Sequence, residues 1–346
     1  MSAGMEMREI APGYSISRVI RGGWQLAGGH GEIDRQAAIA GFGLWYDAGI
    51  TVVDCADIYT GVEELVGAFR LGREDLAGFK VHTKFVPDLS VLATIDRAYV
   101  RSIIERSLRR LNTDRLDLVQ FHWWDYAIPG CIETAGWLEE LRREGKIDLL
   151  GGTNFDTDHV EAMVAAGIPL KTMQVQYSVL DSRPAATMAA LGRRLGVSLL
   201  CYGSVAGGFL SEKWLGRPEP KLADLENRSL VKYKLIIDDF GGWDAYQALL
   251  ATLDKIARRH GVGLSTVASR YVLEQPAVAA VIVGARNPDH LSQNLAIGSL
   301  KLTAVDLDEI EAARAKRTGP RGDVYALERD RTSPHGAIMK YDLNKE

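Results

Sequence analysis

Four side chains that can transfer protons follow three successive apolar runs of this sequence. Asp54 and Tyr59 come directly after the run 50–53, Lys84 ends the next run, and His122 ends the one after that. The ammonium group of a lysine favours the phenolate form of a tyrosine, so Lys84 would lower the pKa of Tyr59 from its usual value of about 10. Asp54 would anchor Lys84, and His122 would orient a carbonyl oxygen or relay a proton. This set predicts acid catalysis at a carbonyl oxygen while another group delivers a hydride to the carbon.

The segments that carry these residues alternate between short apolar runs and longer amphipathic ones. We predict strands at 19–24, 51–54, 80–84, 116–122, 148–153, 173–177, 198–202 and 279–283. Helical patterns cover 34–48, 94–111, 137–144, 157–166, 184–195, 244–260, 265–274 and 288–297. Repeated strand–helix alternation favours an α/β fold whose parallel strands close into a (β/α)8 TIM barrel. An open, doubly wound sheet is the alternative.

The barrel explains how residues far apart in the sequence would meet. Side chains alternate across a strand, so Val52 and Asp54 share one face. If Asp54 points into the mouth of the barrel, Lys84 and His122 point there as well, because the carboxyl ends of the strands share one side. Tyr59 lies beyond its strand, on a loop that can fold over the opening.

No linker divides the chain, so we expect a single barrel domain over residues 1–346, with its core at about 15–310 and a C-terminal extension at 311–346. Residues 203–243 form the longest segment without a role in the barrel, which favours a substrate or cofactor loop. The polar tail from Gly319 has two interpretations, a solvated extension or a flap over the strand ends.

Composition argues against several classes of protein. The formal net charge of −4 and the lack of a basic block do not favour nucleic acid or an anionic membrane as a partner. No apolar run reaches the roughly 18 residues that would span a bilayer, and the first residues do not form a signal segment. Three scattered cysteines, Cys55, Cys131 and Cys201, favour a reducing compartment over a disulfide framework. We therefore expect a cytoplasmic enzyme.

Several short segments, taken in order, resemble those of the aldo-keto reductase family. They are 54–59, 83–84, 116–122, 144–147, 152–155 and 284–294, and the similarity extends over roughly 15–310. The resemblance implies a (β/α)8 barrel, a nicotinamide cofactor and a catalytic tetrad of Asp54, Tyr59, Lys84 and His122. In that family a hydride passes from the nicotinamide to an aldehyde or ketone, or back from the alcohol, while the tyrosine handles the proton on oxygen.

The resemblance also implies where the cofactor binds. Thr153, Asn154 and Gln176 would hold the nicotinamide carboxamide, and Tyr202 would stack on its ring. The stretch 207–210 resembles the loop that covers the pyrophosphate in that family, and its glycines permit close approach of the backbone. The full set of implied cofactor residues is Thr153, Asn154, Gln176, Tyr202, Gly203, Gly208, Leu210, Gly284, Arg286, His290, Gln293 and Asn294.

Some positions depart from the family pattern. The loop after Tyr59 and the segment 203–205 both differ from the usual sequence. The positions of the lysine and arginine that flank a ribose 2′-phosphate are Gly284 and His290 in this chain. Arg286 remains as a strong cation for that phosphate, which favours NADP over NAD.

Three tryptophans are candidates for the wall of a substrate pocket. Trp24 precedes the glycines of 28–31, which lack the GxGxxG spacing of dinucleotide-binding folds. Trp123 and Trp124 follow His122, and adjacent residues at a strand end cannot both face inward, so at least one is expected to line the pocket. An aromatic pocket wall favours a substrate, either a carbonyl compound or a sugar, that presents an aromatic or sugar-like face.

Two other functions are compatible with the same residues. A cofactor-binding subunit could report redox state to a partner with little turnover, as some relatives of these reductases serve channels. A metal-dependent hydrolase could use Asp54, His82 and His122, although no His-x-His pair at a strand end supports a metal site.

Overall fold

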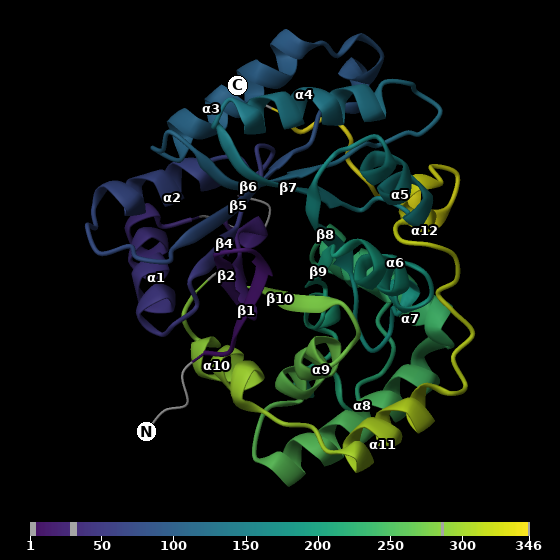
Figure 1. Cartoon of the computed structure of the whole chain (residues 1–346). Helices are drawn as coiled ribbons and strands as arrows, with labels where there is room; N and C mark the ends of the chain where they lie inside the picture. Colours follow the sequence, from purple (N-terminus) through teal and green to yellow (C-terminus); the bar gives the residue numbers. More distant parts are fainter. Residues whose placement is uncertain (1–4, 28–32, 285–286, 345–346) are drawn as a thin grey trace.

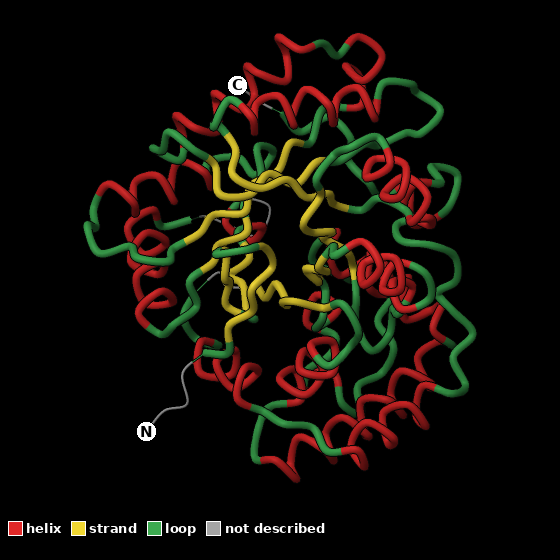
Figure 2. The backbone as a smooth tube through the Cα atoms, in the orientation of Figure 1, coloured by secondary structure: helices red, strands yellow, loops and turns green. Residues whose placement is uncertain are grey.

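Eight parallel strands close into a barrel in the computed structural model, which describes residues 5–27, 33–284 and 287–344. Around the ring they are β3 (Val19–Gly22), β4 (Val52–Asp54), β5 (Lys80–Phe85), β6 (Leu116–Phe121), β7 (Ile147–Thr153), β8 (Leu170–Gln176), β9 (Ser198–Tyr202) and β10 (Val278–Gly284). β10 pairs with β3 and completes the ring of strands seen in Figure 2. The predicted (β/α)8 barrel is confirmed, and the open sheet is excluded.

Helices surround this ring, as Figure 1 shows. They are α1 (Arg35–Asp47), α2 (Val62–Leu71), α3 (Arg97–Arg110), α4 (Cys131–Arg143), α5 (Thr157–Ala165), α6 (Met188–Leu195), α8 (Gly242–His260), α9 (Leu264–Leu273), α10 (Leu291–Ser299) and α11 (Ala304–Arg314). Asp34 caps α1 because its carboxylate accepts hydrogen bonds from the backbone N–H groups of Gln36 and Ala37. In the described part of the chain, none of the helices has the length and apolar character of a membrane span.

Some helices differ from the sequence prediction. α2 and α11 are additional, and α4 begins at Cys131 rather than at 137. The first turns of α4 contain Glu133 and Thr134, which interrupt its apolar pattern although Thr134 is buried. α10 begins at Leu291 rather than at 288, after His290 at its N-cap.

A hairpin closes the end of the barrel where the strands begin. It consists of β1 (Met7–Ala11) and β2 (Tyr14–Ser17), which pair antiparallel. Tyr14 and Ile16 of this hairpin pack in one buried cluster with Ile20 and Val52, which face the barrel interior. The hairpin lies across the strands in Figure 1. The other end, where the strands finish, is therefore the end left for chemistry.

Two segments cover that other end. Residues 203–243 contain short 3-10 turns and α7 (Arg228–Phe240), which packs against the turn Ala206–Gly208. The tail carries α12 (Ala326–Arg329) and α13 (Pro334–Ala337). In Figure 1 the tail passes α5 and ends near α3, where Asn344 contacts Arg106. The flap interpretation of the tail is therefore supported over a solvated extension.

Candidate active site

Asp54 and Lys84 form a buried ion pair at the ends of neighbouring strands. The Lys84 Nζ lies 2.9 and 2.8 Å from the two Asp54 carboxylate oxygens and donates to the Cys55 carbonyl at 2.7 Å. Asp54 is opposite His82 in the ladder between β4 and β5, so Lys84 lies one inward-facing position further along. Burial alone would lower the pKa of Lys84, but the Asp54 carboxylate, through its charge and its hydrogen bonds, outweighs burial and raises that pKa. The lysine stays charged.

Two amides complete the environment of Asp54. Gln174 on β8 donates to its Oδ1 at 2.6 Å, and Gln120 on β6 donates to the same oxygen at 3.3 Å. Both glutamines point into the barrel and are buried. Sequence reasoning did not assign them a role, although strand parity places Gln120 on the same face as His122. They hold the carboxylate so that Lys84 faces the mouth.

Tyr59 lies next to this pair, on the loop between β4 and α2. The Lys84 Nζ is 4.9 Å from the centroid of the Tyr59 ring, and the centroid of the Trp24 ring is 5.1 Å from it. Burial raises the pKa of Tyr59 to about 12, while Lys84 opposes the shift. The predicted lowering of the Tyr59 pKa is therefore wrong in its net direction, because desolvation exceeds the effect of Lys84. The phenol keeps its proton at neutral pH.

His122 follows β6 at the same end of the barrel. Its Nδ1 lies 2.9 Å from the Thr153 carbonyl oxygen, and because a carbonyl only accepts, Nδ1 carries the proton. Burial, followed by the charge of Arg329, lowers the pKa of His122 to about 3. The ring is therefore neutral, and its Nε2 is an acceptor that has no partner among the described residues. His122 can receive a hydrogen bond in the mouth, but it does not readily donate one.

The tryptophans separate as strand alternation requires. Trp124 turns inward, with its ring centroid 4.3 Å from that of His122 and its N–H donating to the Pro87 carbonyl. Trp123 turns outward, is fully buried in the core, and donates to the Asp125 and Ile128 carbonyls. The assignment of Trp123 to the pocket is corrected, because its indole fills the layer between strands and helices.

The side chains expected to hold a carboxamide come from the ends of β7 and β8. Gln176 donates through Nε2 to Asp181 at 2.7 Å, and its buried Oε1 has no partner in the described residues. Tyr202 donates from its hydroxyl to Asn154 Oδ1 at 2.9 Å. The free oxygen of Gln176 fits the N–H donors of a carboxamide, which is what a nicotinamide would present.

The stretch expected to cover a pyrophosphate follows β9. Gly203 and Gly208 have positive φ values of 76° and 102°, and a side chain at Gly203 would collide with the Tyr233 hydroxyl. Glycine is required there because α7 packs so closely. Leu210 is different, since its side chain is buried in the core and its N–H donates to the Val205 carbonyl. Leu210 therefore has no donor free for a phosphate, which corrects its direct assignment.

The expected adenine end lies on and around α10. Asn294 has a buried Nδ2 without a partner among the described residues, which fits an acceptor nitrogen of a purine. Gln293 and Glu212 both approach Gly263, so the loop 203–243 reaches this region. His290 and Gly284 are exposed. Arg286 lies outside the described residues.

Other charged residues of the mouth were missed from the sequence. Arg183 forms buried ion pairs with Asp181 at 2.7 Å and Glu328 at 2.9 Å, and Lys232 lies 3.7 Å from Glu328. Arg329 donates to the carbonyls of the residues that follow β6 and β7. Because these contacts join the tail to distant loops, no local pattern indicates them.

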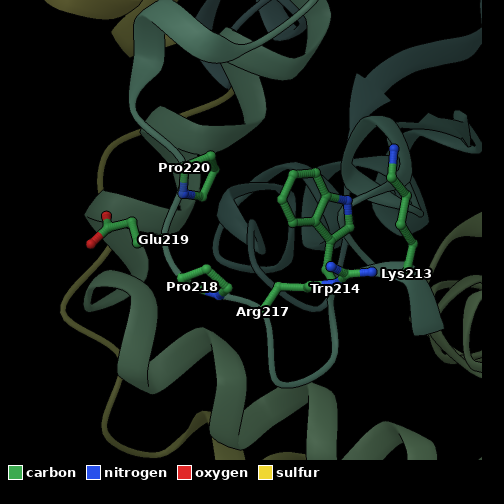
Figure 3. Close-up of a pocket in the computed structure, with 6 residues that line it drawn as sticks. All are labelled: Lys213, Trp214, Arg217, Pro218, Glu219 and Pro220. Carbon is green, nitrogen blue, oxygen red and sulfur yellow. The ribbon is translucent and has the colours of Figure 1, made fainter.

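An open surface pocket on loop 203–243 contains none of the predicted catalytic residues. It is lined by Lys213, Trp214, Arg217, Pro218, Glu219 and Pro220. Figure 3 shows Trp214 and Lys213 on one side of the hollow and Pro220 with Glu219 on the other. Trp214 packs on Phe209, with ring centroids 4.7 Å apart.

The metal-site alternative requires Asp54, His82 and His122 to converge. Both oxygens of Asp54 are engaged by Lys84, and the His82 ring lies toward the hairpin, 6.2 Å from the Tyr14 ring. Among the residues that the structure describes, no group of three or more His, Cys, Asp or Glu side chains is placed to hold a metal ion.

Comparisons with known proteins identify the family. The profile of the Aldo/keto reductase family matches residues 18–315. Aldo-keto reductase YhdN of Bacillus subtilis is 29% identical over 314 residues, which cover 88% of this chain and 92% of that protein. The NADH-specific methylglyoxal reductase of Escherichia coli is 26% identical over 321 residues, covering 84% and 93% of the two chains.

A solved structure agrees with the fold. The glycerol dehydrogenase of Gluconobacter oxydans superposes with a TM-score of 0.77 at 24% identity, covering 93% of this chain and 98% of that one. The barrel, the matched profile and the relatives lead to one conclusion: the chain belongs to the aldo/keto reductase family of oxidoreductases, which typically use NAD(P)H and small carbonyl substrates.

Proposed function

We propose that this protein reduces an aldehyde or ketone to an alcohol, or catalyses the reverse oxidation, with NAD(P)H. A bound nicotinamide would supply or accept the hydride. The observation that carries the proposal is the buried Lys84–Asp54 pair beside Tyr59 at the end of the barrel where the strands finish.

Tyr59 is the group that gives its proton to the carbonyl oxygen. Its pKa of about 12 keeps the proton in place at neutral pH, so Tyr59 is ready for reduction. Once the proton leaves, the ammonium of Lys84 stabilises the phenolate. Asp54 holds Lys84 in position, and His122, as a neutral acceptor, orients the hydroxyl of the alcohol.

Two of the residues that would hold the cofactor have polar atoms without a partner among the described residues: Gln176 Oε1 would take the carboxamide and Asn294 Nδ2 the adenine. Asn154, whose Oδ1 accepts from the Tyr202 hydroxyl, would assist at the carboxamide, with Tyr202 beside the ring. We propose NADP(H) as the preferred form because Arg286 can pair with a 2′-phosphate. A relative named for NADH specificity means that family membership alone does not decide this preference. Replacing Arg286 with alanine should raise the KM for NADPH at least tenfold and leave that for NADH unchanged.

The test of the proposal is turnover of a panel of aldehydes and ketones by the wild-type protein, with NADPH and NADH in separate assays. We expect reduction of several members of the panel. Tight cofactor binding without reduction of any member, and without oxidation of the corresponding alcohols, would instead favour the redox-sensing subunit.

A further inference from the structure

α7 directs two basic side chains toward the mouth of the barrel. Arg228 and Lys232 are one helical turn apart, so they lie on the same face of the helix. The contacts of Lys232 show what this face of α7 packs against. Its Nζ lies 5.2 Å from the centroid of the Tyr202 ring and 5.7 Å from that of the Tyr325 ring. Arg228, one turn away on the same face, is therefore held near the end of β9 and the tail.

Lys232 and Arg228 differ in the groups with which they interact. Lys232 lies 3.7 Å from Glu328, which also receives two hydrogen bonds from Arg183. Within the described part of the chain, Arg228 has no carboxylate at ion-pairing distance, and its Nη1 is buried without a hydrogen-bond acceptor. Burial lowers the pKa of Arg228, and the side chain that counteracts this effect is Tyr325.

Tyr325 packs against His122 and is within electrostatic range of Arg228. Its ring centroid is 5.7 Å from that of His122, in an edge-on arrangement. Its backbone has a φ of 61°, an unfavourable value for a tyrosine, so the neighbouring residues must hold it there. Glu328 and Arg329 do so, because each is fixed to the barrel loops by hydrogen bonds. The group that flanks Arg228 is thus also a wall of the predicted carbonyl site.

Partial burial of a guanidinium without a carboxylate partner costs free energy, unless a bound ligand supplies the missing negative charge. The planar fork of arginine matches the two oxygens of a carboxylate. Arg329, whose charge acts on His122, already donates to three backbone carbonyls. The guanidinium of Arg228 therefore suits a ligand with a single negative charge.

We propose that Arg228 binds a carboxylate carried by the carbonyl substrate, so that the preferred substrates are oxo acids or aldehydes with an acidic group. This inference rests on the proposed reductase function. The phosphates of the cofactor are another source of oxyanions, because Ser229 lies beside Gly207 of the glycine-rich turn. The experiment must separate the two.

A matched pair of substrates provides that separation. 4-Carboxybenzaldehyde and methyl 4-formylbenzoate share the same aldehyde and ring and differ in the negative charge. We expect wild type to prefer the acid in kcat/KM, and Arg228→Gln to reduce that preference about ten- to hundredfold, through KM. Arg228→Lys should restore part of it. The dissociation constant of NADPH and the kinetics with the ester should be unchanged.

Arg193→Gln is the control, because Arg193 is an exposed arginine of α6. It removes the same charge and should leave the acid-to-ester ratio at the wild-type value. Equal use of acid and ester by wild type, or an equal effect of Arg228→Gln on both, would overturn the inference while leaving the reductase function intact. Weaker NADPH binding with an unchanged ratio would assign Arg228 to the cofactor and also overturn it.

Binding tests the inference even without turnover. In the presence of saturating NADP+, which cannot reduce an aldehyde, wild type should bind the acid at least tenfold more tightly than Arg228→Gln does. Failure of wild type to reduce either aldehyde would count against the proposed function. Equal binding of the acid by the two proteins would count against the role of Arg228.

Discussion

Two buried ion clusters at the same end of the barrel are built in different ways. Asp54 and Lys84 lie on adjacent strands, whose backbone ladder fixes their separation. Arg183, Glu328 and Lys232 come instead from the loop after β8, the tail and α7. The first pair presents charge to Tyr59, whereas the second cluster fastens the segments that cover the mouth. Under the proposed function, reaction chemistry and substrate access would thus depend on separate parts of the molecule.

Breaking the strand pair should have the largest effect. Lys84→Met leaves Asp54 buried beside two glutamines without its counter-ion, which costs about 3–5 kcal/mol of stability. It also removes the charge that stabilises the phenolate of Tyr59, so kcat/KM should fall at least about 100-fold. Urea denaturation and steady-state kinetics measure the two effects.

The double variant Asp54→Asn/Lys84→Met separates stability from chemistry. It should recover most of the lost stability, because no charge is left unpaired, and none of the activity. Recovery of activity would show that the charge of Lys84 has no role in the reaction.

Breaking the tail cluster should have a smaller effect on a different quantity. Glu328→Gln removes the acid that pairs with Arg183 and Lys232, while Asp181 still holds Arg183. Stability should fall by about 1–3 kcal/mol, and the tail should become sensitive to limited proteolysis. We expect KM to rise severalfold with a smaller change in kcat. A large loss of kcat at unchanged KM would contradict the separation of the two clusters.

A third comparison is the pH dependence of stability that His82 causes at the end of the barrel closed by the hairpin. Burial lowers the pKa of His82 from 6.5 to about 3, so the folded protein binds its proton less readily than the unfolded chain does. His82 therefore costs no stability above pH 6.5 and destabilises the fold progressively as the pH falls toward 3, by about 1.4 kcal/mol per pH unit. His82→Leu should be less sensitive to acid than wild type between pH 7.5 and 5.5 in urea titrations. Equal sensitivity would contradict the burial of a neutral imidazole.

An exposed pair gives the smallest effect. Arg101 and Glu144 are 2.5 Å apart on the outer surface, where solvent screens the attraction. Arg101→Gln should leave the denaturation midpoint within experimental error. A shift comparable to that of Glu328→Gln would mean that short distance, rather than burial, determines the importance of these pairs.

The same contrast explains what could be predicted from the sequence. The strands and the inward positions of Asp54, Lys84 and His122 follow from local apolar runs and from alternation along a strand. The contact of Arg183 with Glu328, 145 residues apart, leaves no such local trace. α7 was missed because it lies within a segment rich in glycine and proline.

The net direction of a pKa shift could also not be predicted from the sequence. Proximity of Lys84 to Tyr59 was inferred correctly, but the pKa of Tyr59 depends on how much water the folded loop excludes. Desolvation is a property of the packed structure, and here it exceeds the effect of the lysine. The orientation of Trp123, by contrast, follows from alternation, because an inward-facing His122 turns Trp123 outward and Trp124 inward.

The most direct test of the central claim, that Tyr59 delivers the proton, is the rate of cofactor oxidation in a single turnover. Wild type and Tyr59→Phe, each with bound NADPH, would be mixed with a saturating aldehyde that the wild type reduces. The account predicts a rate about 10²–10⁴-fold lower for Tyr59→Phe, with the dissociation constant of NADPH unchanged. A rate close to that of wild type in Tyr59→Phe would contradict it.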